Sequence, residues 1–156
     1  MAGTRSKALS VMDIQFYEDE TGSEPCREWI DKLGNIEREA ILTAIELVLA
    51  ERGTDVCQTE FGKNLGQGLY EFRLRWTAEE VKSKVGRVSD AAAEKSAKIL
   101  LRVFFCTGPG RKIILLLSGY DKGKDPSGRR QQREIVKARK LYTAHCEALK
   151  RGRKQA

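Results

Sequence analysis

The run IILLLSGY at residues 113–120 constrains the fold more than any other feature of this chain. Apolar side chains occupy consecutive positions there, whereas a half-buried strand alternates apolar and polar residues. Such a strand is covered on both faces, so we expect a central strand with layers packed on either side. Its longest unbroken apolar stretch, Ile113 to Leu117, is far shorter than the roughly 20 residues that a helix needs to cross a bilayer. We therefore expect no membrane partner.

Three other segments have strand-like patterns. VMDIQFYE (11–18) and GLYEFRLRW (68–76) alternate apolar and polar residues, and KILLRVFFC (98–106) is apolar apart from one arginine. The turn residues TGPG join the segment at 98–106 to the central strand, which predicts a hairpin.

Apolar residues at helical spacing predict three helices, over residues 23–34, 36–52 and 130–149. A short connection makes the first two a hairpin. Residues 77–98 are rich in Ala, Lys, Glu and Ser and predict an exposed insertion, and RGRKQA predicts a basic C-terminal tail. At 156 residues the chain has the size of one domain, 1–156. The sequence therefore predicts an α+β fold of order βααβββα.

The positive charge of the chain is concentrated in its last third. The net charge is +7, and residues 111–156 hold fourteen Lys and Arg against four Asp and Glu, whereas residues 1–110 hold fifteen against eighteen. This asymmetry favours a polyanionic partner, nucleic acid first. The alternative is a solvated basic helix followed by a frayed tail.

Arg102 is the first candidate for chemistry, because an arginine inside an apolar strand is costly to bury without a partner. The alternatives are an exposed arginine, or one paired with a carboxylate such as Glu71. Glu71, Arg73 and Arg75 share one face of their strand, which suits RNA if that strand neighbours the strand of Arg102. An ordinary solvated sheet face would show the same alternation.

Polar residues also gather where the central strand ends. Tyr120, Asp121, Lys122 and Lys124 could supply the proton transfer and the cations that phosphodiester cleavage requires. The alternative is a turn with solubilising charges. Downstream arginines add candidate RNA contacts, namely Arg129, Arg130 and Arg133.

The cysteine and histidine content argues against a metal site. The four cysteines are widely spaced with no CxxC motif, and His145, the single histidine, falls on the apolar stripe of the last helix. The N-terminus has no apolar stretch typical of a signal peptide, so we expect a cytoplasmic protein with reduced thiols, and neither a metal nor a cofactor.

The segments LYEFRLRW, KILLRVFF, IILLLSGYDKGKDP and REIVKARKLY together resemble the RelE/ParE superfamily of toxins of type II toxin–antitoxin systems, with most similarity to the HigB-like, phage-derived branch. The resemblance covers residues 12–149. It implies a curved antiparallel sheet packed against an N-terminal helical hairpin and a C-terminal helix. It also implies a metal-independent endoribonuclease, an mRNA interferase that inhibits translation, typically on the ribosome, and a helix-turn-helix antitoxin as partner.

Carried over by position, the resemblance places Arg73, Arg102, Tyr120, Lys122 and Lys124 in the catalytic site, with Arg75 as an RNA contact. Two features depart from the family: the insertion at 77–98, and Gly123 between two lysines that are often adjacent. A ParE-like inhibitor of gyrase and an inactive basic binding module stay open as alternative functions, because one fold serves them all.

Overall fold

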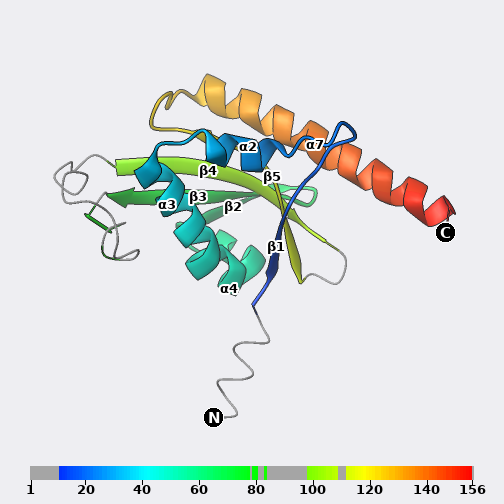
Figure 1. The fold of residues 1–156 in the computed structure, drawn as a ribbon, viewed down its shortest axis with the longest axis horizontal. Coiled ribbons are helices and arrows are strands. Elements are labelled where there is room, and N and C mark those ends of the chain that lie inside the picture. Colours follow the sequence, from blue (N-terminus) through cyan, green and yellow to red (C-terminus); the bar gives the residue numbers. More distant parts are fainter. Residues whose placement is uncertain (1–10, 78, 81–82, 84–97, 109–111, 156) are drawn as a thin grey trace, which may run out of the picture.

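The computed structural model describes residues 11–77, 79–80, 83, 98–108 and 112–155. A five-stranded sheet with helices on both faces forms the molecule (Figure 1), which confirms the α+β class. Its strands are β1 (Asp13–Phe16), β2 (Gly62–Gly66), β3 (Leu69–Thr77), β4 (Lys98–Thr107) and β5 (Ile113–Asp121). Its helical elements are α2 (Pro25–Asp31), α3 (Asn35–Ala44), η1 (Ile45–Leu49), α4 (Ala50–Arg52), η2 (Gly53–Gln58) and α7 (Gly128–Gln155).

The strand order is β1-β5-β4-β3-β2, so β5 is a central strand as its apolar run predicts. Ile114 and Leu116 belong to the core on one face, and Leu115 and Leu117 to the core on the other. The expectation of a wholly antiparallel sheet is wrong, because β1 pairs with β5 in parallel. Helices, not a tight turn, connect β1 to the opposite edge of the sheet, so no hairpin dictates its direction.

Strand β2 is an addition to the expected order. Its sequence GKNLG has neither alternation nor β-branched residues, and it pairs with β3 through a turn in which Gly66, Gln67 and Gly68 all have positive φ. The backbone of that turn, not side-chain patterning, brings the strand back along β3.

Helices α2, α3, η1 and α4 cover one face of the sheet, and α7 crosses the other (Figure 1). The helix expected at 36–52 contains a π-helical turn, η1, which buries Leu49 while Leu47 is exposed. Arg38 ties α2 to α3 by donating to the carbonyl oxygens of Asp31 (3.0 Å) and Leu33 (2.8 Å). Glycine at position 119 lets the α2 layer approach β5, because a Cβ there would overlap the ring of Trp29.

Helix α7 extends to Gln155, so most of the expected tail is helical. The expected insertion lies largely outside the described residues, but its ends, Thr77 and Lys98, face each other as a register pair of β3 and β4. Among the described helices, none combines the length and apolarity that a bilayer crossing requires.

Candidate functional site

Three predicted site residues lie in one row across the sheet. Arg73 pairs with Arg102 between β3 and β4, and Arg102 pairs with Tyr120 between β4 and β5. Directly paired residues of neighbouring strands project to the same face. This is the face covered by α7, because Phe104, two residues from Arg102, packs in the core beneath that helix. The structure therefore brings together residues from three separate sequence motifs.

Two further cations lie beside this row. Arg75 is exposed two residues beyond Arg73, and it pairs in register with Leu100. The backbone N–H of Lys122 donates to the carbonyl oxygen of Leu100 (2.9 Å), which places Lys122 next to the same part of the sheet. We call Arg73, Arg75, Arg102 and Lys122 the cationic cluster.

One buried carboxylate partly balances these four cations. Glu71 is fully buried, and its Oε1 accepts a bond from Nε of Arg73 at 2.7 Å. Its Oε2 accepts a longer bond, 3.5 Å, from Nε2 of Gln131 on α7. The Arg73 side chain keeps 28% of its surface exposed, so the ion pair reaches from the interior to solvent. The cationic cluster is therefore strongly positive despite Glu71.

Arg102 is buried more completely than its position in the sequence suggests. It is 5% exposed, and its Nε and Nη1 donors lack a hydrogen-bond partner among the described residues. Burial lowers the pKa of Arg102, and the negative charge of Glu71 acts against that effect. Unsatisfied buried donors cost free energy, so this guanidinium has unused capacity to bind an anion.

Tyr120 is buried, and two groups pack against its ring. Its ring stacks on Phe104 at a centroid distance of 6.1 Å, and the guanidinium of Arg130 lies 5.4 Å from its centroid. Burial raises the pKa of the Tyr120 hydroxyl, and Glu71 raises it further. Because the ring is buried, a base of RNA does not reach it in this arrangement.

The structure distinguishes the two predicted lysines. Lys122 is half-buried, and its pKa is lowered by burial and then by the nearby positive charges of Arg102 and Arg73. Lys124 is exposed farther along the turn, which Asp121 shapes by accepting the N–H of Gly123 (2.8 Å). This hydrogen bond of Asp121 shapes the turn, and it does not support a role of Asp121 as a general base. Of the two lysines, Lys122 is the one that lies close enough to Arg102 and Arg73 for their charges to lower its pKa.

The first turn of α7 adds positive charge beside the cationic cluster. Ser127 caps the helix by accepting the N–H of Arg130 (3.1 Å). Arg130 also pairs with Glu134 (2.9 Å), whereas Arg129 and Arg133 are exposed. Of the three arginines of α7 that were predicted to contact RNA, Arg129 and Arg133 are therefore exposed to solvent, and Arg130 covers Tyr120.

Two buried cysteines and His145 lie apart from this region, whereas the half-buried Cys57 lies close enough for the charge of Arg73 to act on it. Burial raises the pKa of Cys26 and of Cys106 to about 12, so both thiols are protonated at neutral pH. His145 follows Gln131 by about 21 Å of helix. Among the described residues, no group of three or more metal-ligating side chains occurs.

Gln131 and Ser118 also lie in this region and were not predicted from the sequence. Ser118 is buried two residues before Tyr120, and its hydroxyl has no partner among the described residues. Its place inside an apolar run was a usable signal, whereas no pattern identifies Gln131 as the α7 residue that reaches Glu71. Comparison of the chain with protein-family models, with curated proteins and with solved structures gives no match.

Proposed function

We propose that this chain is a RelE/ParE-like toxin that binds RNA at the cationic cluster and cleaves it without a metal ion. The observation that supports this most is the row Arg73–Arg102–Tyr120 with Lys122 beside it. Residues that the family resemblance would place in a catalytic site are distant in the sequence but adjacent on the sheet. A RelE-like fold is part of the same proposal.

In the proposed reaction, the ribose 2′-oxygen attacks the adjacent phosphorus, and the bond to the 5′-oxygen of the next nucleotide breaks. The 2′-hydroxyl loses a proton and the leaving oxygen gains one. Arg73 and Arg102 stabilise the negative charge that develops on the phosphoryl oxygens. Lys122 is suited to proton transfer, because its lowered pKa brings its neutral form closer to physiological pH.

Binding of RNA would use the exposed cations that surround the half-buried ones. Arg75, Arg129 and Arg133 are exposed, so they can neutralise flanking phosphates without a change of fold. The proposed substrate is mRNA on the ribosome in the cytoplasm, and the proposed partner is a helix-turn-helix antitoxin. An acidic segment of that antitoxin would complement the cationic cluster.

One observation favours a second function. Arg102 and Tyr120 are almost completely buried, so they are poorly accessible to the reacting atoms of a substrate, which favours a basic binding module that does not cleave RNA. Inhibition of gyrase, the ParE-like activity, stays an alternative that cleavage assays separate from the first. Fold alone does not separate the three.

The test compares lysine variants in a reconstituted translation system with a defined mRNA. We expect the wild-type chain to cut the mRNA, and Lys122→Gln to cut it on the order of 10²-fold more slowly, because it loses a cation in the transition state. Lys124→Gln should retain most activity, and Lys32→Gln, at the exposed C-terminal end of α2 on the opposite face of the sheet, serves as a matched surface control.

Circular dichroism and thermal melting verify that all three variants are folded. Equal cleavage by Lys122→Gln and Lys32→Gln would contradict the role of Lys122. If the wild-type chain binds RNA but produces no cleavage on ribosomes or on free RNA, the inactive binding module is the better account. A gyrase supercoiling assay then tests the ParE-like alternative.

A further inference from the structure

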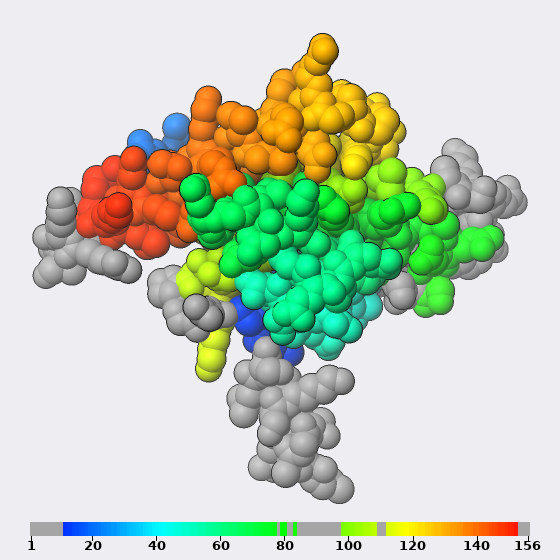
Figure 2. All heavy atoms as spheres, turned by 180° about the vertical axis from the view of Figure 1, so that it is seen from behind, coloured from blue at the N-terminus to red at the C-terminus, as the bar shows by residue number. Residues whose placement is uncertain are grey.

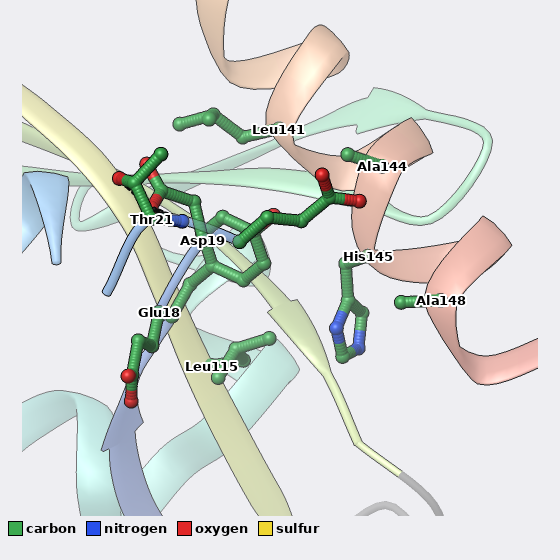
Figure 3. A pocket seen from close by; sticks show the side chains of 10 residues that line it. Glu18, Asp19, Thr21, Leu115, Leu141, Ala144, His145 and Ala148 are labelled. Atoms are coloured by element: carbon green, nitrogen blue, oxygen red, sulfur yellow. Dashed lines mark hydrogen bonds between the residues drawn. The ribbon is translucent and has the colours of Figure 1, made fainter. Parts of the chain in front are cut away.

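A second surface lies near the other end of α7. A groove of about 630 Å³ separates the turn after β1 from the C-terminal half of the helix (Figure 3). We call it the acidic groove; Glu18, Asp19 and Glu20 line one side, and Leu115, Leu141 and His145 are among its other lining residues. We propose that the acidic groove binds a short amphipathic peptide segment of a partner protein, with large apolar side chains flanked by Lys or Arg.

The apolar side of the acidic groove comes from the periodicity of α7. Leu141, Ala144, His145 and Ala148 follow helical spacing, so they line one face of the helix, as Figure 3 shows. Ala144 and Ala148 are exposed, although both line the groove. Apolar surface of this kind gains free energy when a partner's side chains cover it.

Helix α7 leaves this surface open because it is longer than the sheet that it covers. Its 28 residues extend about 42 Å, whereas the nine residues of β5 extend about 30 Å. Ala138 is its one fully buried residue among those whose side chains are described, and residues 147–152 are all exposed. In Figure 1 the C-terminal end of α7 projects beyond the strands. The part of α7 that extends toward and beyond the end of the sheet therefore forms one wall of the acidic groove.

The opposite wall is held rigidly and is negatively charged. Oδ1 of Asp19 accepts the backbone N–H of Thr21 (2.9 Å), the hydroxyl of Thr21 (2.6 Å) and the N–H of Ser23 (3.0 Å). These bonds lower the pKa of Asp19, so its carboxylate is charged at neutral pH. The wall therefore keeps its shape and its charge without a partner.

The chain itself shows that this rim accepts a guanidinium. Nη2 of Arg151 lies 3.3 Å from Oε1 of Glu20, and both side chains are largely exposed, at 57% and 89%. An exposed ion pair of this kind is weak in water, so an arginine of a partner can replace Arg151. The acidic rim is also opposite in sign to the net charge of the chain, +7. The excess of basic residues lies in residues 111–156, so a basic peptide is attracted to the acidic rim and repelled by the cationic cluster.

The experiment uses the full chain and two fluorescein-labelled 14-residue peptides. One has Leu on one helical face and Lys on the other, and its matched partner has Glu in place of every Lys. Fluorescence anisotropy at 0.1 M salt measures affinity, and amide chemical shifts of the ¹⁵N-labelled chain locate the contact. We expect the Lys peptide to bind and to shift residues of the turn after β1 and of α7 near His145. We expect the Glu peptide to bind at least tenfold more weakly.

Two double variants of equal charge change separate the acidic groove from general electrostatics. Glu18→Lys/Glu20→Lys reverses the rim, and Glu39→Lys/Glu46→Lys reverses two exposed glutamates on α3 and η1. The first should weaken binding of the Lys peptide at least tenfold, and the second by less than threefold. Ala148→Trp should also weaken binding, because its ring would occupy the groove.

Four outcomes would overturn the proposal: no binding of the Lys peptide, equal binding of the Glu peptide, equal losses in the two double variants, or chemical shifts confined to the cationic cluster. Because no RNA is present, the result does not depend on the proposed RNA cleavage.

Discussion

At the scale of single residues, the charge balance of the cationic cluster depends on Glu71. Its carboxylate is fully buried, lies 2.7 Å from Nε of Arg73 and offsets the burial of Arg102. We expect Glu71→Gln to reduce the free energy of unfolding by about 3 kcal/mol, because it leaves buried positive charge uncompensated. Urea denaturation followed by circular dichroism measures this change.

Glu134→Gln is the matched control for that prediction. Glu134 pairs with Arg130 at 2.9 Å, and its side chain is 14% exposed whereas that of Glu71 is fully buried. Its replacement should cost less than about 1 kcal/mol. Equal losses in the two variants would show that Glu71 does not stabilise the buried arginine, and that Arg102 is balanced in another way.

Residue patterns predicted which side chains share a face better than they predicted burial. The alternation of LYEFRLRW correctly placed Glu71, Arg73 and Arg75 together. The apolar context of Arg102 left open an exposed position as well as one paired with Glu71, and the structure buries Arg102. The covered ring of Tyr120 was not predictable, because Arg130 reaches it from a helix whose placement the sequence leaves open. The periodicities of two residues in strands and 3.6 residues in helices describe single elements, whereas contacts between layers depend on how the elements pack.

At the scale of elements, β3 and β4 end directly opposite each other, at the register pair Thr77 and Lys98. Replacing residues 78–97 by Asn-Gly should therefore close a two-residue hairpin, since this dipeptide favours the type I′ turn that suits twisted strands. We expect the melting temperature to change by less than about 3 °C, because a one-kcal/mol loss shifts it by about that much in a chain of this size. Calorimetry of the shortened and full chains tests this, and a large decrease would show that the removed segment packs on the core.

Helix α7 carries the histidine that makes its packing sensitive to pH. Burial lowers the pKa of His145 below its usual value of about 6.5, and its ring makes an edge contact with Tyr17 at 5.9 Å. As the pH falls through the unfolded pKa, the unfolded chain binds a proton that the folded chain excludes. We expect the free energy of unfolding to be lower at pH 5.5 than at pH 7.5.

Urea denaturation at the two pH values measures this difference, and His145→Gln provides the comparison. The variant should be less stable at both values but should lose most of the difference between them. Carboxylates with lowered pKa values, such as Asp19 and Asp125, affect stability only at more acidic pH. An unchanged difference in His145→Gln would show that another group is responsible.

Elements with strong periodicity were predictable, and elements defined by backbone geometry were not. The central position of β5 follows from its apolar run, and the helices of the first layer follow from their stripes. The π-helical turn η1 and the strand β2 arise from local backbone geometry, in η1 from an inserted residue and in β2 from the positive φ at Gly66, Gln67 and Gly68. Hydropathy contains no information about either.

At the scale of the whole molecule, charges of opposite sign lie toward different ends of α7. The cationic cluster lies near its first turn, and the acidic groove lies beside its C-terminal half. Figure 2 shows α7, in yellow to red, as a ridge along the molecule from one region to the other. A polyanion and a basic peptide would therefore approach from different directions, and occupation of one site leaves the other accessible.

The last prediction uses this separation to count the cations that contact RNA. For a single strand, the logarithm of the binding constant falls with the logarithm of salt concentration by about 0.7 for each phosphate neutralised. If three or four cations of the cationic cluster and its surroundings contact phosphate, the slope is about −2 to −3. Fluorescence anisotropy with a 2′-O-methyl RNA, which lacks the attacking hydroxyl, measures binding between 50 and 300 mM salt without cleavage.

Charge variants then identify which cations contribute. Lys122→Gln should make the slope shallower by about 0.7, as expected for one lost phosphate contact. Lys32→Gln, at the exposed C-terminal end of α2, and the rim variant Glu18→Lys/Glu20→Lys should leave the slope unchanged. A wild-type slope near zero would exclude the cationic cluster as a phosphate-binding surface. A slope that becomes shallower in both lysine variants and steeper in the rim variant would show that net charge, not the row formed by Arg73, Arg102 and Tyr120, governs the association.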